Sequence, residues 1–144
     1  MAERLEGRVA LITGAGSGLG RAMARRMASD GAAVMCSDVD EEAAQDTAAQ
    51  IGESGGRSAA IRLDVTDSDA VQASMQSTIG ELGGIDIVVN NAGIGGAFGW
   101  DATVGVNLSG VYYGLLHGAA LLAERGGGAI VNIASVAGLN ALVG

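Results

Sequence analysis

A stretch near the start of the chain joins a buried strand to a glycine-rich turn. The apolar run Val9–Ile12 has no polar alternation, which is typical of a strand covered on both faces of a parallel sheet. Glycines follow at every second position, namely Gly14, Gly16, Gly18 and Gly20. Glycine permits a tight turn and a close approach of the backbone to a ligand, and the helix that starts there offers unpaired N–H groups to a pyrophosphate. The stretch therefore predicts a strand–turn–helix unit able to bind an anion.

The rest of the chain alternates apolar runs with helical patterns. Strands are predicted at residues 8–13, 32–37, 59–63, 85–90 and 129–134, and helices at residues 18–28, 41–51, 67–82 and 103–124. Such alternation produces right-handed βαβ units with helices on both faces of one sheet. The prediction is an α/β fold of the Rossmann type, a doubly wound parallel sheet of strand order 3-2-1-4-5, truncated before the later strands of such a sheet.

Capping residues support these boundaries. Gly31 follows the first helix as a C-cap, and Thr66-x-x-Asp69 resembles a capping box that opens the third helix. Asp40 is a candidate N-cap of the second helix. On the first helix, Leu19 is expected on the apolar face, together with two methionines further along.

Asp38 ends the second predicted strand, roughly twenty residues beyond the glycine turn. At that place an acidic side chain can bond the ribose 2′-hydroxyl of NAD, and its charge would repel a 2′-phosphate. No Lys or Arg lies between residues 35 and 50 to receive such a phosphate. The local alternative is that Asp38 only caps the next helix, but the pattern favours NAD over NADP as the ligand.

Charge and composition restrict the partners and the location. The 144 residues carry a formal net charge of −8 with only 8 Lys and Arg, which argues against nucleic acid or an anionic membrane as partner. Residues 1–7 have no apolar core, and no apolar run of about 18 residues exists, so neither a signal peptide nor a membrane span is predicted. The expected location is the cytoplasm. Cys36 is expected to be a core residue without a redox role, and no metal site is predicted.

The motif Thr13-Gly-x-x-x-Gly-x-Gly20 resembles the cofactor motif of the short-chain dehydrogenase/reductase family. Asp64-Val65 after the third strand and Asn90-Asn91-Ala92-Gly93 after the fourth extend the resemblance. In that family the Asp-Val pair contacts the adenine, and the Asn-Asn-Ala-Gly segment braces the sheet and lines the cofactor site. The resemblance implies a single NAD(P)-binding domain over residues 1–144, incomplete at its carboxyl end. It implies cofactor contacts at Gly14, Ser17, Gly18, Leu19, Gly20, Asp38, Val39, Asp64, Val65, Asn91, Ala92 and Gly93.

The resemblance also assigns two catalytic helpers. Asn107 matches the asparagine that interrupts the family's long central helix and holds a water of its proton relay, although local reasoning alone also allows a solvated helix position. Ser135 matches the serine that orients a substrate oxygen, although a serine at a strand end is ordinarily a turn residue. His117, the only histidine, is expected to be packed or paired rather than catalytic.

The sequence departs from the family pattern in two places. The interval from Gly93 to Trp100 is several residues shorter than the helix-bearing connection usual there. The family's Tyr-x-x-x-Lys is absent, and Tyr112 and Tyr113 cannot replace it because the chain contains no lysine. The 144 residues are therefore expected to be inactive alone.

The sequence thus favours an NAD-dependent oxidoreductase that transfers hydride between NAD(H) and an alcohol or ketone. A non-catalytic dinucleotide-binding or oligomerising fragment is the main alternative, and an S-adenosylmethionine methyltransferase is a distant one. The family's central helix commonly packs against its copy in another subunit, and the apolar surface of residues 103–124 therefore predicts a homo-oligomer. The substrate is expected to be a small alcohol or carbonyl compound.

Overall fold

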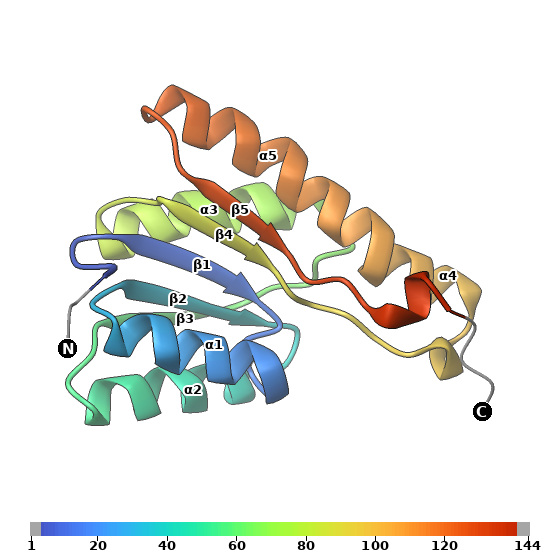
Figure 1. Ribbon diagram of the computed structural model, residues 1–144, viewed down its shortest axis with the longest axis horizontal. Coiled ribbons are helices and arrows are strands. Elements are labelled where there is room, and N and C mark those ends of the chain that lie inside the picture. The colour runs from blue at the N-terminus through green and yellow to red at the C-terminus, as the bar shows by residue number, and fades with distance from the viewer. Residues whose placement is uncertain (1–3, 141–144) are drawn as a thin grey trace.

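A five-stranded parallel sheet forms the centre of the computed structural model, which describes residues 4–140 (Figure 1). The strands are β1 (Val9–Thr13), β2 (Ala33–Asp38), β3 (Ser58–Arg62), β4 (Ile87–Asn90) and β5 (Ala129–Asn132). Their order in the sheet is β3-β2-β1-β4-β5, and every pairing is parallel. The predicted topology is confirmed. Residues 1–3, part of the segment considered for a signal peptide, lie outside the described residues.

Helices cover both faces of this sheet. The main helices are α1 (Gly18–Ser29), α2 (Glu41–Glu53), α3 (Ser68–Leu82), α4 (Trp100–Val104) and α5 (Gly110–Glu124). Shorter turns are the 3₁₀ segments η1 (Gly96–Phe98) and η3 (Val136–Gly138) and the π-helical segment η2 (Gly105–Ser109). In Figure 1, α1 and α2 lie on one side of the sheet, and α3 and α5 lie on the other.

Each face of the sheet buries its own apolar core, because successive side chains of a strand point to opposite faces. Leu11 of β1 packs with α3 and α5, whereas Ile12 packs with α1 and α2. All five residues of β1 are buried, as expected for a strand covered on both faces. Cys36 is fully buried in the second core, and burial raises the pKa of its thiol to about 12. This agrees with the predicted structural role of the cysteine.

A stripe of glycines lets α5 approach the sheet closely. Gly110, Gly114 and Gly118 are all buried. A Cβ atom at Gly110 would lie 2.7 Å from a methyl group of Val65, and one at Gly114 would overlap the amide oxygen of Asn90. The helix backbone therefore lies directly against the side chains of Val65, just after β3, and of Asn90, the last residue of β4.

The predicted capping box of α3 is wrong. The N-cap is Asp67, whose carboxylate accepts the N–H groups of Asp69 at 3.0 Å and Ala70 at 3.1 Å. Thr66 instead donates its hydroxyl to Asp64 at 2.7 Å. The carboxylate at position 67 satisfies the first free N–H groups of the helix, so the threonine is not required there.

Other helix ends follow the sequence more closely. Asp40 caps α2 by accepting the Ala43 N–H at 3.1 Å, and Gly31 takes a φ of 99° just after α1. Leu19 is not on the buried face of α1, because its side chain is 58% exposed at the start of the helix. The buried residues of that helix are Gly20 and Ala24.

The long central helix begins earlier than predicted and is not uniform. It runs through α4, η2 and α5, and Asn107 lies inside the π-helical segment. The predicted interruption at Asn107 is therefore observed. The connection from Gly93 to Trp100 contains only the short turn η1. Between residues 4 and 140, no helix is both long enough and apolar enough to span a bilayer.

Candidate functional site

A cavity of about 750 Å³ opens at the carboxyl ends of the strands, beside the start of α1. In open α/β sheets this edge, at the point where the strand order reverses, is where ligands bind. All twelve predicted cofactor residues line this cavity. The structure thus gathers residues from four separate segments of the chain around one space.

The glycine turn forms one wall of the cavity. Gly14 has a φ of 65°, which favours glycine, and a Cβ atom at Gly20 would overlap the carbonyl oxygen of Gly14. Ser17 is the N-cap of α1, but its side chain makes no capping bond, and the first turn of α1 carries no acid. The N–H groups at the start of α1 are therefore not satisfied by a cap and can receive an anion.

Asp38 faces the same turn from the end of β2. Its Oδ2 accepts the Gly16 N–H at 2.8 Å, and its Oδ1 accepts the Asp40 N–H at 3.0 Å. A carboxylate has about four acceptor positions, so each oxygen keeps one for a further donor. Asp38 does not cap α2, since Asp40 has that role. The carboxylate is fixed at the cavity wall with acceptor capacity left.

The segment after β4 ties the sheet to the glycine turn. The Thr13 hydroxyl oxygen accepts the N–H groups of Asn91 and Ala92, both at 3.0 Å. The Asn91 amide donates in turn to the carbonyl oxygens of Thr13 at 3.0 Å and Gly14 at 3.2 Å. These bonds join β1 to the chain that leaves β4, which is the bracing that the resemblance implied.

Asp64 and Val65 lie on the far side of the cavity, just after β3. Asp64 accepts the hydroxyl of Thr66 at 2.7 Å and its N–H at 3.0 Å. These bonds hold the pKa of Asp64 below its ordinary value, and the bond from the Thr66 hydroxyl has the larger effect. The aspartate is therefore ionised at neutral pH, while Val65 is buried beneath α5.

The two predicted catalytic residues lie outside the lining of this cavity. Asn107 pairs with the backbone of Ile94, donating to its carbonyl and accepting its N–H, both at 2.8 Å. It is therefore a bridge between η2 and the chain after β4 and not merely a solvated helix residue. The Ser135 hydroxyl oxygen accepts the Ala137 N–H at 3.1 Å at the start of η3, and the residue is exposed.

His117 pairs as expected, with its Nε2 2.9 Å from the hydroxyl of Ser68 across the α3–α5 contact. Among residues 4–140, no group of three His, Cys, Asp or Glu side chains could hold a metal ion. The cavity lining also contains the hydroxyl groups of Ser17 and Thr66 and the carboxylates of Asp38, Asp64 and Asp101.

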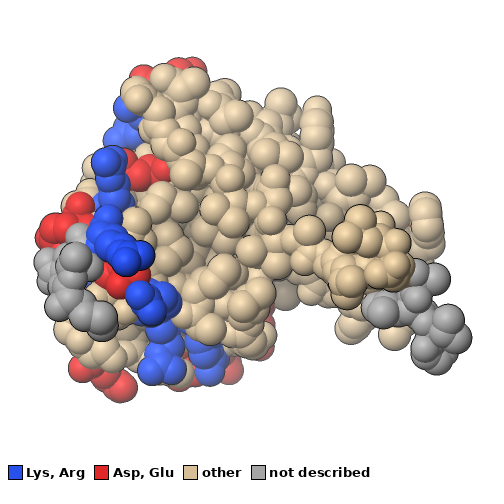
Figure 2. Space-filling model, in the orientation of Figure 1, with Lys and Arg blue, Asp and Glu red and all other residues tan. Residues whose placement is uncertain are grey.

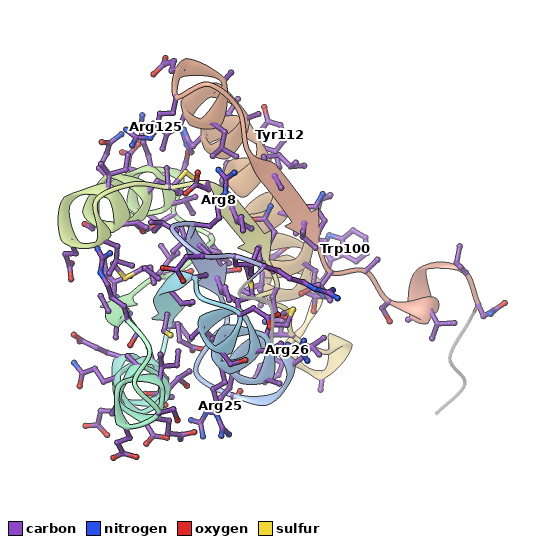
Figure 3. The ribbon with its side chains drawn as sticks, turned by 60° about the vertical axis from the view of Figure 1, so that its left-hand side comes forward. Arg8, Arg25, Arg26, Trp100, Tyr112 and Arg125 are labelled. Carbon is purple, nitrogen blue, oxygen red and sulfur yellow. The ribbon has the colours of Figure 1, made fainter. Side chains whose placement is uncertain are left out.

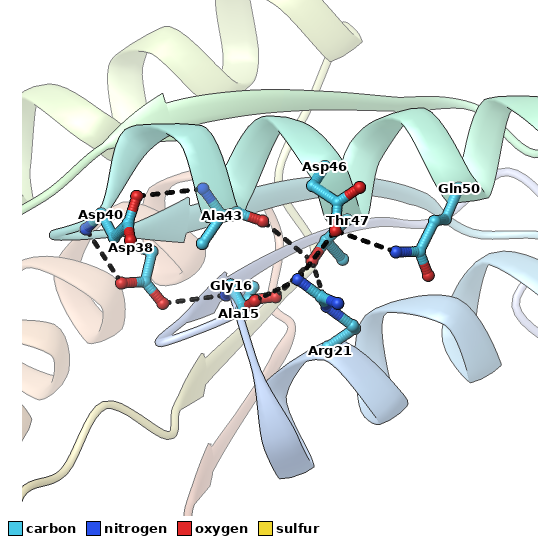
Figure 4. A network of polar contacts seen from close by, with 9 residues as sticks. All are labelled: Ala15, Gly16, Arg21, Asp38, Asp40, Ala43, Asp46, Thr47 and Gln50. Carbon is cyan, nitrogen blue, oxygen red and sulfur yellow. Dashed lines mark hydrogen bonds and ion pairs between the residues drawn. The ribbon is translucent and has the colours of Figure 1, made fainter.

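Arg21, which the sequence did not single out, is the one cation bonded to the glycine turn within the described part of the chain. Its guanidinium donates to the Gly16 carbonyl at 2.5 Å and to the Thr47 hydroxyl at 3.0 Å (Figure 4). A signal was present in the sequence: an arginine one residue after the last glycine, near the start of a helix. Its partner on α2 lies too far along the sequence for local patterns to identify.

A second, larger hollow of about 1300 Å³ lies at the opposite end of the sheet. Figure 2 shows cationic side chains gathered along that end, and Figure 3 labels Arg8, Arg25, Arg26 and Arg125 there. Arg8 pairs with Asp86 at 3.2 Å and Arg26 with a neighbouring aspartate. The helices α1, α2, α3 and α5 also end on this side. Cations balance the negative ends of helices, so the arginines are accounted for without a ligand.

Comparison with known proteins decides the family. The sequence profile of a family described as "short chain dehydrogenase" matches residues 8–144. The chain belongs to this family. The match sets aside the methyltransferase alternative.

Other members of the family resemble the chain in sequence and in fold. The chain is 40% identical over 147 aligned positions to a 2,5-dichloro-2,5-cyclohexadiene-1,4-diol dehydrogenase of Sphingobium indicum, covering 96% of this chain and 59% of the relative. A short-chain type dehydrogenase/reductase of Mycobacterium marinum superposes with a TM-score of 0.91 at 34% identity, over 99% of this chain and 61% of the other.

A third relative was solved with a cofactor. The short-chain dehydrogenase/reductase of Burkholderia phymatum in complex with NAD superposes with a TM-score of 0.89 at 36% identity, over 96% of this chain and 53% of the other. The chain therefore spans less than two thirds of the length of each of these three relatives.

Proposed function

We propose that residues 1–144 are the cofactor-binding part of an NAD-dependent oxidoreductase that transfers hydride between NAD(H) and an alcohol or ketone. The observation that carries the proposal is the convergence of the glycine turn, Asp38 and the segments after β3 and β4 on one cavity of about 750 Å³. Pockets of about 300–1,000 Å³ are usual for small ligands and cofactors. Two of the relatives, a diol dehydrogenase and a short-chain dehydrogenase/reductase in complex with NAD, support the same function.

The residues present fit a dinucleotide. The uncapped start of α1 suits the pyrophosphate, because its free N–H groups and partial positive charge favour an anion. Asp38 would accept a hydroxyl of the adenine-side ribose with the acceptor positions that its backbone bonds leave open. Asp64 and Val65 would line the adenine, and Asn91, Ala92 and Gly93 would line the rest of the cofactor.

The same carboxylate favours NAD over NADP. A 2′-phosphate would bring a second negative group next to Asp38, and like charges at short range repel. Arg21 is near the glycine turn but does not line the cavity; its Nε donates to Thr47, and its Nη2 is bonded to Gly16 and paired with Asp46. Among residues 4–140, no Lys or Arg lines the cavity where a 2′-phosphate would lie.

For the chemistry, the bound nicotinamide supplies or accepts the hydride. Ser135 would donate its hydroxyl proton to a substrate oxygen, which is compatible with its bond to Ala137 because that bond uses only an acceptor position. Asn107 would hold the η2 backbone in place through its pair of bonds to Ile94. Neither side chain is a general acid or base of the required strength.

We further propose that the 144 residues alone have no appreciable turnover, because they contain no Tyr-x-x-x-Lys. A positioned acid or base contributes about 10²–10⁴ in rate. A steady-state assay at the nicotinamide absorbance, with a panel of alcohols and ketones, should show activity only for a longer version that adds this motif. Equal turnover by both would place the acid or base within residues 1–144 and refute this part of the proposal.

Cofactor titration tests the NAD assignment itself. Fluorescence titrations with NADH and NADPH should show tighter binding of NADH, and Asp38→Ala should weaken NADH by about 1.5–3 kcal/mol while leaving NADPH less affected. Glu42→Gln, which removes a negative charge on α2 outside the cavity lining, is the matched control and should change neither affinity. Equal affinities in the wild type, or a preference for NADPH, would overturn the role of Asp38.

The position of Asn107 and Ser135 outside the cavity lining favours a second candidate, a dinucleotide-binding module without catalysis. The two functions differ in the assay of the longer version. Cofactor binding without turnover in that version would support the module, and turnover would support the dehydrogenase.

A further inference from the structure

Side chains from three elements hold the peptide groups at the centre of the glycine turn (Figure 4). Asp38, at the end of β2, accepts the Gly16 N–H at 2.8 Å. Arg21, on α1, donates to the Gly16 carbonyl at 2.5 Å. Thr47, on α2, donates to the Ala15 carbonyl at 2.9 Å. Two consecutive carbonyl groups of the turn are thus held by side chains that do not line the cavity.

Arg21 and Thr47 are also bonded to each other and to α2. The Arg21 Nε donates to the Thr47 hydroxyl at 3.0 Å, and its Nη2 lies 3.0 Å from a carboxylate oxygen of Asp46. The Thr47 side chain is fully buried, and its hydroxyl oxygen also lies 3.1 Å from the Ala43 carbonyl. A buried hydroxyl that takes part in several bonds fixes one arrangement of its neighbours, because losing one partner leaves a polar group unsatisfied.

The turn also packs tightly against α2 at this point. A Cβ atom at Gly16 would lie 2.8 Å from the Ala43 Cβ and 2.8 Å from the Asp38 carboxylate. The backbone of the turn therefore cannot move toward α2, and the bonds to Arg21 and Thr47 prevent it from moving away. The residues that follow, at the start of α1, line the cavity.

We infer that Arg21 and Thr47 are positioning residues of the dinucleotide site, which set the affinity for the pyrophosphate by fixing the Ala15–Gly16 backbone. The inference rests on the proposed function and goes beyond it, because it places determinants of affinity outside the cavity. Asp46 holds the guanidinium on the α2 side of the turn. Arg21 therefore acts through the backbone and not as a direct phosphate ligand.

The test compares two ligands that contain a pyrophosphate, NADH and ADP-ribose, with adenosine, which lacks it. Dissociation constants for NADH, ADP-ribose and adenosine are measured by fluorescence or calorimetry for the wild type, Arg21→Leu and Thr47→Val. Both variants should weaken NADH and ADP-ribose by about 10-fold, a change typical of one lost interaction, and adenosine by much less. Thr47→Ser keeps the hydroxyl and should restore binding to within about 3-fold of the wild type.

Controls separate positioning from a loss of fold. Arg25→Leu removes an exposed arginine of the same helix that makes no contact with the turn among the described bonds, and it should leave all three affinities unchanged. The midpoint of urea denaturation is measured for every variant. An additional readout is the exchange rate of the Gly16 amide hydrogen, which should rise in Arg21→Leu even without ligand.

The outcomes separate a failure of the positioning role of Arg21 and Thr47 from a failure of the proposed function. Wild-type affinity for ADP-ribose in both Arg21→Leu and Thr47→Val would overturn the inference and leave the proposed function standing. An equal loss of affinity for adenosine and ADP-ribose, together with a lower midpoint of urea denaturation, would show that the two residues only stabilise the fold. That result would also overturn the inference. Failure of the wild type to bind either NADH or ADP-ribose would overturn the proposed function together with the inference.

Discussion

The contact between Gly114 of α5 and Asn90 of β4 offers a sharp test of how the fold holds the site. An alanine at position 114 would place its Cβ atom over the Asn90 amide oxygen, and Asn90 is buried. Asn90 could move only by losing the bond that its Nδ2 donates to Asn132 at 2.9 Å. Asn90 also precedes the Asn91–Gly93 segment of the cavity wall, so strain at this point is transmitted to the site.

The magnitude follows from three opposing effects. Replacing a helical glycine with alanine stabilises a helix by about 0.5–1 kcal/mol. Overpacking a close contact costs about 1–3 kcal/mol, and a buried polar group left without its partner costs about 1–3 kcal/mol more. Gly114→Ala should therefore lower the free energy of unfolding by about 1–5 kcal/mol, even though it improves helix propensity.

Gly80→Ala is the matched control. Gly80 lies in the last turn of α3, where a Cβ atom would meet nothing within 4 Å, so only the helix propensity changes. Urea denaturation followed by circular dichroism should show Gly80→Ala equal to or slightly more stable than the wild type and Gly114→Ala clearly less stable. If Gly114→Ala were as stable as Gly80→Ala, the close approach of α5 to the sheet would be refuted.

Three further predictions concern titration, reactivity and assembly. Because hydrogen bonds from Thr66 lower the pKa of Asp64, they contribute stability above its ordinary value of 3.8 that is lost as the pH falls through the folded value. Thr66→Val should raise this pKa toward 3.8 in an NMR titration of the carboxyl carbon, and an unchanged value would contradict the assignment. Burial raises the pKa of Cys36 to about 12, so a thiol reagent at pH 8 should react only after unfolding in urea, and rapid reaction in native buffer would argue against burial. Exposed apolar side chains on α5, such as Tyr112 and Leu116, predict a homo-oligomer, and a clean monomer by light scattering at tens of micromolar would count against it.

The sheet was predictable because its signals are local. The apolar run of β1, which has no alternating polar residues, predicts a buried strand. The glycines that follow it predict a tight connection, and both signals lie within a few neighbouring residues. The alternation of strands and helices then restricts the strand order, since parallel connections are right-handed. The observed order β3-β2-β1-β4-β5 follows from these rules.

What the sequence did not predict depends on contacts between distant segments or on competition between neighbours. Arg21 and Thr47 are 26 positions apart and meet only after α1 and α2 pack together. At the start of α3, two adjacent residues could each serve as a cap, and Asp67 takes that role because its carboxylate reaches two N–H groups. Leu19 lies exposed beside the cavity because α1 buries its small residues Gly20 and Ala24 instead.

Mapping where NAD⁺ binds on the chain tests the proposed cofactor site. An NMR titration of the ¹⁵N-labelled chain with NAD⁺ reports which backbone amides change their environment on binding. If the cofactor binds at the cavity, shifts are expected in Gly14–Gly20 and Asp38, in the Asp64–Val65 pair and in the Asn91–Gly93 segment, all at the carboxyl edge of the sheet. Shifts confined to the arginine-lined hollow at the opposite edge, or no shifts at all, would contradict the proposed site.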